Sequence, residues 1–177
     1  MMGLLFSPNG RIDQPTYWRS VLILLAISVA ISVLSAFVSP FLSVLGLIFI
    51  WPWIAVHVKR FHDAGKTGWL TIAMVALALI ASTVLGFMLP GLFGVDQLAL
   101  QAEMQEEIER ASRGGAGEAF AATMEATKLA SQATLLPSIA STALVTGIVG
   151  AVMGLFKTDP NDNQYGPGPA GASTVFN

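Results

Sequence analysis

Cysteine is absent from this chain of 177 residues, and histidine occurs only twice. The lack of cysteine excludes disulfides, thiolate metal sites and cysteine nucleophiles. Charge is also scarce, at 11% of residues against roughly 25% in soluble domains, while 54% of residues are hydrophobic. The net charge of −2 argues against nucleic acid as a partner, because nucleic-acid binding generally needs a basic face. The composition indicates an integral membrane protein.

Four apolar segments without Asp, Glu, Lys or Arg, or nearly so, are long enough to cross about 30 Å of hydrocarbon as helices. They cover approximately residues 20–39, 41–58, 69–89 and 135–156. The segments are apolar on all sides and lack the strict alternation of barrel strands. The sequence therefore predicts an all-α integral membrane protein: a four-transmembrane-helix bundle with an extramembrane helical insertion between the third and fourth spans.

Prolines mark the expected breaks between these segments. Ser39-Pro40 alone separates the first two spans, which predicts a tight antiparallel hairpin. Pro52 is expected to kink or end the second helix, leaving residues 57–68 as a loop. Pro90-Gly91 is expected to close the third span. The predicted division of the chain is residues 1–93 with three spans, an insertion at 94–133, a fourth span at 134–156, and a tail at 157–177.

The insertion at 94–133 is rich in Gln, Glu, Ala and Thr and is expected to lie in water. Asp96 can cap a first amphipathic helix that ends at Gly114-Gly115, and a second helix follows Gly117. Two ion pairs are expected on the first helix, Glu106 with Arg110 and Glu109 with Arg113. A helical hairpin of this kind could also dock a protein partner.

The cations set the expected orientation. A cytoplasmic N-terminus places six of the nine Lys and Arg residues on the cytoplasmic side, as the positive-inside rule requires. They are Arg11, Arg19, Lys59, Arg60, Lys66 and Lys157. The C-terminal tail is then also cytoplasmic, and we expect it to be extended.

Three patches of sequence resemble signature positions of the DUF805 family of small bacterial inner-membrane proteins. They are Phe6 with Gly10-Arg11-Ile12 and Tyr17-Trp18; Arg60 to Trp69, with His62-Asp63, Gly65 and Gly68; and Asn163 with Tyr165-Gly166-Pro167 and Pro169. The resemblance implies a multi-pass protein of the bacterial inner (plasma) membrane, and it implies no activity or cofactor, because the family is uncharacterised. The insertion is a departure, since typical members have a short connection there.

The predicted topology places all three patches at the cytoplasmic face, although they lie far apart in sequence. We expect them to form a polar plate. Its candidate residues are Arg11, Tyr17, Trp18, Arg60, His62, Asp63, Gly65, Gly68, Trp69, Asn163 and Tyr165. In this plate Arg11 and Arg60 should face Asp13 and Asp63, with Tyr17, Trp69 and Tyr165 packed at the rim.

Several partners follow from these residues. Anionic lipid headgroups could meet Lys59, Arg60 and Lys66, although orientation alone also requires those cations. His57, His62 and Asp63 could bind a metal, but the histidine spacing does not favour one and we expect none. Gly150 and Gly154 form a GxxxG, which marks either close packing within the bundle or an oligomer.

The favoured function is a structural component, or one that binds proteins or lipids, that uses the plate. The alternative is a membrane-embedded enzyme or a transporter subunit with a His/Asp site at the cytoplasmic rim. The predicted spans contain no charged residue of the kind that transport pathways carry. Catalytic residues, a metal and cofactors are not predicted.

Overall fold

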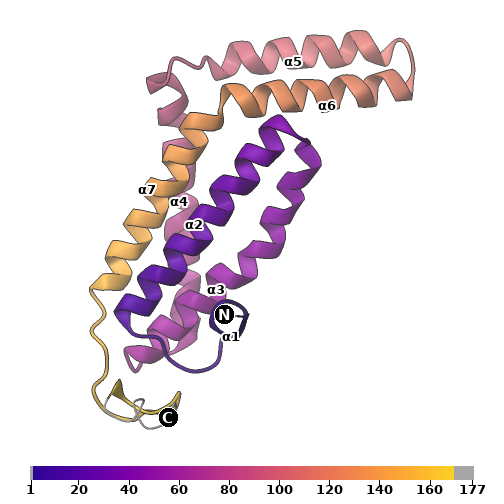
Figure 1. Ribbon diagram of the computed structural model, residues 1–177. Coiled ribbons are helices and arrows are strands. Elements are labelled where there is room, and N and C mark those ends of the chain that lie inside the picture. The colour runs from indigo at the N-terminus through magenta and orange to yellow at the C-terminus, as the bar shows by residue number, and fades with distance from the viewer. Residues whose placement is uncertain (1, 170–177) are drawn as a thin grey trace.

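The computed structural model describes residues 2–169 and consists of a helical bundle with a helical hairpin laid across one end (Figure 1). Among these residues, four helices are long and apolar enough to cross a membrane. They are α2 (Gln14–Phe37), α3 (Leu45–Asp63), α4 (Thr71–Leu92) and α7 (Leu135–Gly154). The prediction of an all-α membrane protein with four spans is therefore confirmed.

Shorter elements complete the chain. A short helix, α1 (Met2–Phe6), precedes the bundle, and 3-10 turns η1 (Pro40–Val44) and η2 (Gly68–Leu70) lead into α3 and α4. The insertion forms α5 (Gln97–Ser112) and α6 (Ala116–Ala133). α1, the tail from residue 157 to 169 and the α3–α4 connection lie at one end of the bundle, called here the polar end (Figure 1). The opposite end, under α5 and α6, is called the hairpin end.

Local sequence signals explain several helix boundaries. Asp13 caps α2 by accepting a hydrogen bond from the Thr16 N–H at 3.0 Å. Asp96 caps α5 in the same way, accepting from two backbone N–H groups, which confirms the predicted cap. Gly115 has a φ of 114° at the turn into α6, where a side chain would be strained. The predicted pair Glu106–Arg110 is also confirmed, at 2.7 Å.

Two prolines lie inside helices, and the loop predicted at residues 57–68 is wrong for residues 57–63. α3 continues through Pro52 to Asp63, so residues 57–63 are helical and only a short connection precedes η2. α4 likewise continues through Pro90 to Leu92. A proline removes one helical hydrogen bond, and packing can offset that loss, since Pro52 and Pro90 are both buried.

The helices do not pack evenly. α2 packs against α3 and α7, and α4 packs mainly against α7, whereas α3 and α4 make far fewer contacts with each other. At the hairpin end, α6 covers the connection between α2 and α3: the Gln132 side chain donates to the Ala36 carbonyl at 2.9 Å, and the rings of Phe41 and Phe120 lie 6.3 Å apart.

The buried apolar core lies in the half of the bundle nearer the polar end. It is formed mainly by residues of α2, α3 and α7: Tyr17, Val21, Leu24, Val56, Phe61, Val149 and Met153. Gly150 allows α7 to approach α2 closely, because a Cβ there would meet the Trp18 ring at 2.4 Å. Gly150, one of the two glycines of the GxxxG pattern, therefore allows close packing of α7 on α2 within the same chain.

Candidate functional site

Asp63, the last residue of α3, is a common acceptor for side chains from three parts of the chain. Its carboxylate pairs with Arg60 one turn earlier and with Arg11 at 3.4 Å, and it accepts from the Thr158 hydroxyl at 2.7 Å. The Asp63 side chain is 5% exposed. A buried carboxylate needs such partners, because an unpaired buried charge is costly.

Arg60 is the most deeply buried charged residue described, with no exposed surface. Besides Asp63, its guanidinium donates to the Phe156 carbonyl just beyond α7 and to the Thr158 hydroxyl at 3.3 Å. A cation at this place satisfies a carbonyl at the C-terminal end of a helix and complements the helix dipole. Arg60 therefore joins the end of α3 to the end of α7.

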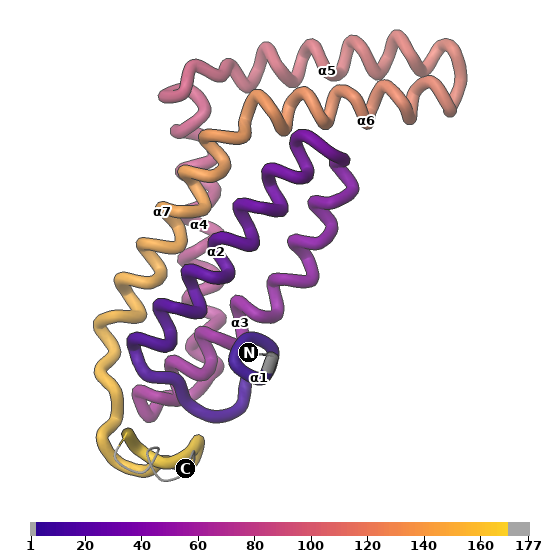
Figure 2. Tube along the Cα trace, viewed as in Figure 1, coloured from indigo at the N-terminus to yellow at the C-terminus, as the bar shows by residue number. Residues whose placement is uncertain are grey.

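Arg11 binds the tail through backbone oxygens. Its guanidinium donates to the carbonyls of Asp159 at 2.5 Å, Asn161 at 2.8 Å and Gly166 at 3.4 Å, and to the carbonyl of Asp63 at 3.2 Å. The tail turns back under the polar end instead of leading away from it (Figure 2). An Asp159 N–H to Asp63 carbonyl bond of 2.7 Å adds to this attachment. The expectation of an extended tail is therefore wrong for residues 157–169.

His62 and the tail form a second contact. The rings of His62 and Tyr165 are stacked, with centroids 3.7 Å apart and an interplanar angle of 3°. His62 Nδ1 lies 3.1 Å from the Gly10 carbonyl oxygen and so carries a proton there, because that oxygen can only accept. The Asn163 amide donates to the His62 carbonyl at 3.1 Å. These contacts bring segments of all three predicted patches together.

The two glycines of the α3–α4 connection have steric reasons to be glycine. Gly65 has a φ of 67°, and a Cβ there would lie 3.0 Å from an Asp159 carboxylate oxygen. At Gly68 a Cβ would meet Val58 at 2.7 Å. The Asn161 backbone N–H and the Asn163 side-chain amide hold the pKa of Asp159 below its usual range. Asp159 is thus an ionised acceptor that fastens the turn of the tail.

The cluster of Arg11, Arg60, His62, Asp63, Thr158, Asp159, Asn163 and Tyr165 is called here the polar cluster. Four residues expected in the plate lie elsewhere. Asp13 caps α2 instead of facing an arginine. Tyr17 is buried in the core, where its hydroxyl lies 3.2 Å from His57 Nε2, and Trp69 is 78% exposed instead of packing at the rim. Trp18 packs on Gly150.

The cations expected near headgroups differ in their surroundings. Lys59 is 3% exposed and donates to the carbonyls of Gly3 and Leu4, while Trp51 donates to that of Phe6 at 2.8 Å. These bonds satisfy carbonyls at the end of α1 and hold it against α3. Arg60 is buried, so Lys66 is the member of the three that lies exposed at the surface.

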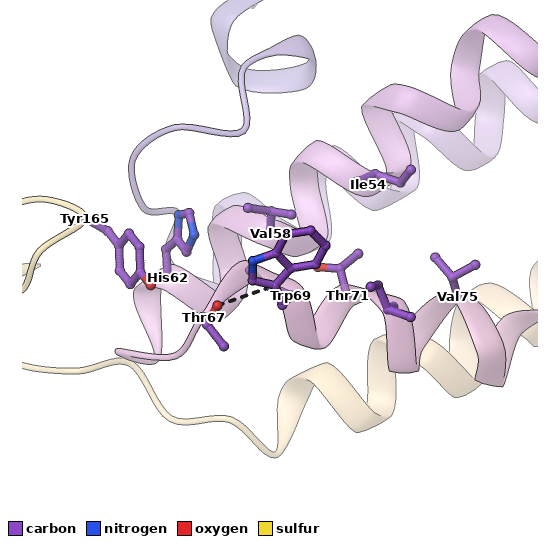
Figure 3. Close-up of a pocket in the computed structure, with 10 residues that line it drawn as sticks. Ile54, Val58, His62, Thr67, Trp69, Thr71, Val75 and Tyr165 are labelled. Carbon is purple, nitrogen blue, oxygen red and sulfur yellow. Dashed lines mark hydrogen bonds between the residues drawn. The ribbon is translucent and has the colours of Figure 1, made fainter.

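A groove of about 530 Å³ opens between α3 and the start of α4, next to the polar cluster (Figure 3). Its walls are apolar: Ile54, Val58, Ile72, Val75 and the Trp69 ring. At its polar end lie His62, Thr67 and Tyr165. Figure 3 shows the stacked rings of His62 and Tyr165 at one side and Val75 at the other. Gly68 packs closely against Val58, whereas α3 and α4 make few contacts with each other beyond this point, and the groove lies between them.

The polar cluster holds chain segments together through hydrogen bonds and ion pairs. Both carboxylate oxygens of Asp63 are engaged by cations or a hydroxyl, and His57 and His62 have separate partners. Among residues 2–169, no three His, Asp or Glu side chains converge as metal ligands.

The sequence-based prediction missed Thr158 and Asp159, although both directly follow the fourth span, where such partners could have been sought. It also missed the His57–Tyr17 contact, which no local pattern indicates.

Comparison with known proteins gives one match. A family model described as "Protein of unknown function (DUF805)" matches residues 5–167, nearly the whole chain. The matched region includes all members of the polar cluster and also the acidic hairpin. No curated protein and no solved structure matches the chain.

Proposed function

Because this chain belongs to the DUF805 family of membrane proteins of unknown function, we propose a role that fits its clamped polar end: it binds an anionic phospholipid in the groove between α3 and α4. The polar cluster holds the groove in shape and does not itself perform chemistry. The protein is then a lipid-binding structural component of the membrane.

The polarity of the groove is the observation on which this proposal rests. Ile54, Val58 and Val75 lie within apolar membrane helices and suit an acyl chain, while His62 and Thr67 at the helix ends offer polar groups where a headgroup would lie. A phospholipid has the same order of apolar and polar parts along the membrane normal. A soluble polar substrate would match only one end of the groove.

Charge favours an anionic headgroup. Lys66 is exposed beside Thr67, and a cation near the membrane surface attracts anionic lipid by about 1 kcal/mol. Arg60 and Lys59 are already bonded to carbonyls and a carboxylate, so they stabilise the fold and do not bind the headgroup directly. One exposed lysine gives a modest preference for anionic lipid over zwitterionic lipid.

The orientation proposed is that of a bacterial inner-membrane protein with both termini in the cytoplasm. The cations Arg11, Lys59, Arg60 and Lys66 support it, because they gather at the polar end. A reporter fused at Gly115, in the turn between α5 and α6, should be active only as a periplasmic reporter. Activity of a cytoplasmic reporter at that position would overturn the orientation.

Photocrosslinking tests the lipid site. The protein is reconstituted in nanodiscs of phosphatidylethanolamine and phosphatidylglycerol that contain phosphatidylglycerol with a diazirine in its acyl chain. We expect adducts to concentrate in peptides covering residues 54–75, and Val75→Trp, which fills the groove, to reduce them strongly. Leu79→Trp is the matched control, because Leu79 lies one turn further along α4, is 64% exposed and does not line the groove.

Two results would count against the site. Adducts spread evenly over all four spans would indicate an ordinary lipid annulus. Equal losses in Val75→Trp and Leu79→Trp would show that the groove has no special role. Lys66→Ala should reduce labelling by phosphatidylglycerol more than labelling by a phosphatidylethanolamine probe with the same chain.

A further inference from the structure

A cavity of about 310 Å³ lies inside the bundle and adjoins the groove between α3 and α4. Ile54, Thr71 and Val75 line both spaces. In Figure 3, Ile54 and Val75 lie on the side of the groove away from Tyr165, which is the side further into the membrane spans. The groove therefore leads from the polar end toward the interior of the bundle.

Three helices each turn one face toward this cavity, which is called here the inner cavity. The lining positions recur every three or four residues on each helix and are Ile50, Trp53, Ile54 and His57 on α3; Met74, Val75, Ala78 and Ser82 on α4; and Ser141, Val145 and Val149 on α7. Because α3 and α4 make few contacts with each other, these faces do not close against one another.

The surface of the inner cavity is mainly apolar, and no charged side chain of residues 2–169 lines it. Two of its polar side chains are already bonded within the protein. His57 Nε2 lies 3.2 Å from the Tyr17 hydroxyl and Nδ1 lies 2.7 Å from the Trp53 carbonyl oxygen, while the Thr142 hydroxyl donates to the Ser138 carbonyl at 2.9 Å. The inner cavity therefore suits an apolar occupant.

The surrounding bilayer supplies such an occupant. Water would find few hydrogen-bond partners in an apolar cavity, and an empty cavity would forgo dispersion contacts along its walls. From Thr71 to Ser82, α4 rises about 17 Å at roughly 1.5 Å per residue. This length is close to the roughly 15 Å of hydrocarbon in one leaflet. A lipid chain that starts at the polar end would thus reach the far end of the inner cavity.

We propose that one acyl chain of the phospholipid in the groove passes between α3 and α4 and lies inside the bundle, with its terminal carbons against α7. This inference rests on the proposed lipid site and extends it, because the ligand is then held inside the protein by its chain. The occupant is part of a membrane phospholipid and not a free fatty acid.

Two photoprobes test the position of the chain. Both are phosphatidylglycerol in nanodiscs with the full protein, one with a diazirine next to the glycerol ester and one with a diazirine at the chain terminus. Val145 lines the inner cavity, whereas its neighbour Leu144 is 47% exposed and lines none of the cavities described. We expect the terminal probe to label Val145 at least as often as Leu144, read residue by residue by mass spectrometry. The ester-proximal probe should label the groove, at residues 58–69.

Filling the inner cavity should displace the chain. Ala78 lines the inner cavity and not the groove, so Ala78→Phe should reduce labelling of Val145 several-fold and leave Leu144 and the groove unchanged. Ala76→Phe is the matched control, because Ala76 is exposed and lines neither space. If Ala78→Phe lacks a thermal transition, Ser141→Phe takes its place.

The outcomes separate this inference from the lipid site itself. A groove that is labelled while Val145 is not would overturn the inference and leave the lipid site standing. No labelling at either place would overturn both, and labelling of Val145 alone would show that the chain does not enter through the groove. Labelling of Val145 by a fatty acid with the same terminal diazirine, but not by the phospholipid, would show a free chain and overturn the inference. Equal losses in Ala78→Phe and Ala76→Phe would show that the adducts do not come from the inner cavity.

Discussion

The two halves of the bundle are built differently. Near the polar end, α2, α3 and α7 bury their side chains against one another, and every buried charge described there has a partner. Toward the hairpin end, none of the residues from Leu45 to Trp51 of α3 is buried. Two cavities lined in part by Ser and Thr side chains lie in this second half.

The difference shows what holds membrane helices together. Inside a bilayer the hydrophobic effect gives helices little reason to associate, so packing and satisfied polar groups must do so. The polar half has both, through Gly150 against Trp18 and through Asp63 with its arginines. We infer that the polar half supplies most of the stability of the bundle.

The largest expected effect is at Asp63. Asp63→Ala leaves the buried Arg60 and Arg11 without their carboxylate, and removal of one partner from a buried ion pair costs about 3–5 kcal/mol. Denaturant titration in mixed micelles measures the loss. Glu106→Ala is the control, because it breaks an ion pair whose side chains are more than 70% exposed and should change stability little. Equal free energies of unfolding for Asp63→Ala and Glu106→Ala would show that the buried ion pairs of Asp63 do not stabilise the polar half.

A smaller effect is expected at Gly150. Gly150→Val inserts a branched side chain where Trp18 already lies, and overpacking of this kind costs about 1–3 kcal/mol. A Cβ added at Gly147, one turn earlier in α7, would have no neighbouring atom within 4 Å, so Gly147→Val should be nearly neutral. The thermal transitions of both variants in detergent make the comparison. A loss at Gly147 as large as at Gly150 would mean that the close packing of Gly150 on Trp18 does not determine the result.

The smallest effect expected in the polar half is at Tyr165. Tyr165→Ala removes the ring stacked on His62, and such aromatic contacts contribute about 0.5–1.5 kcal/mol beyond burial. Tyr165→Phe keeps the stacked ring and should behave like the unmodified chain. The midpoint of denaturant titration distinguishes them. If Tyr165→Phe is as unstable as Tyr165→Ala, the hydroxyl matters and stacking is not the cause.

The spans, the Asp96 cap and the Glu106–Arg110 pair can be predicted because each depends on residues close in sequence. The errors have a different origin. The loop predicted after Pro52 is helical over residues 57–63, because burial against neighbouring helices offsets the hydrogen bond that Pro52 removes, and a sequence does not display that packing. Lys59 is expected at lipid headgroups, whereas it bonds to carbonyls of α1, a short helix that the sequence does not predict.

The polar cluster is predictable in outline and not in detail. Topology alone indicates that the three patches share one face. Which carboxylate pairs with the arginines depends on geometry: Asp13 lies at the start of α2 and caps it, while Asp63 lies at the end of α3, within reach of Arg11 and Arg60. The groove is not predictable in this way, because it depends on how α3 and α4 are spaced.

The central claim is that the tail is a folded part of the polar half, bonded to α3 and Arg11. Hydrogen–deuterium exchange of the full chain in nanodiscs tests it directly, read at residues 158–166 and, for comparison, at the exposed turn at 113–117. We expect slow exchange at Asp159, whose N–H donates to the Asp63 carbonyl, fast exchange at the turn, and loss of the tail's protection in Asp63→Ala. A tail that exchanges as fast as the turn in the unmodified protein would contradict it.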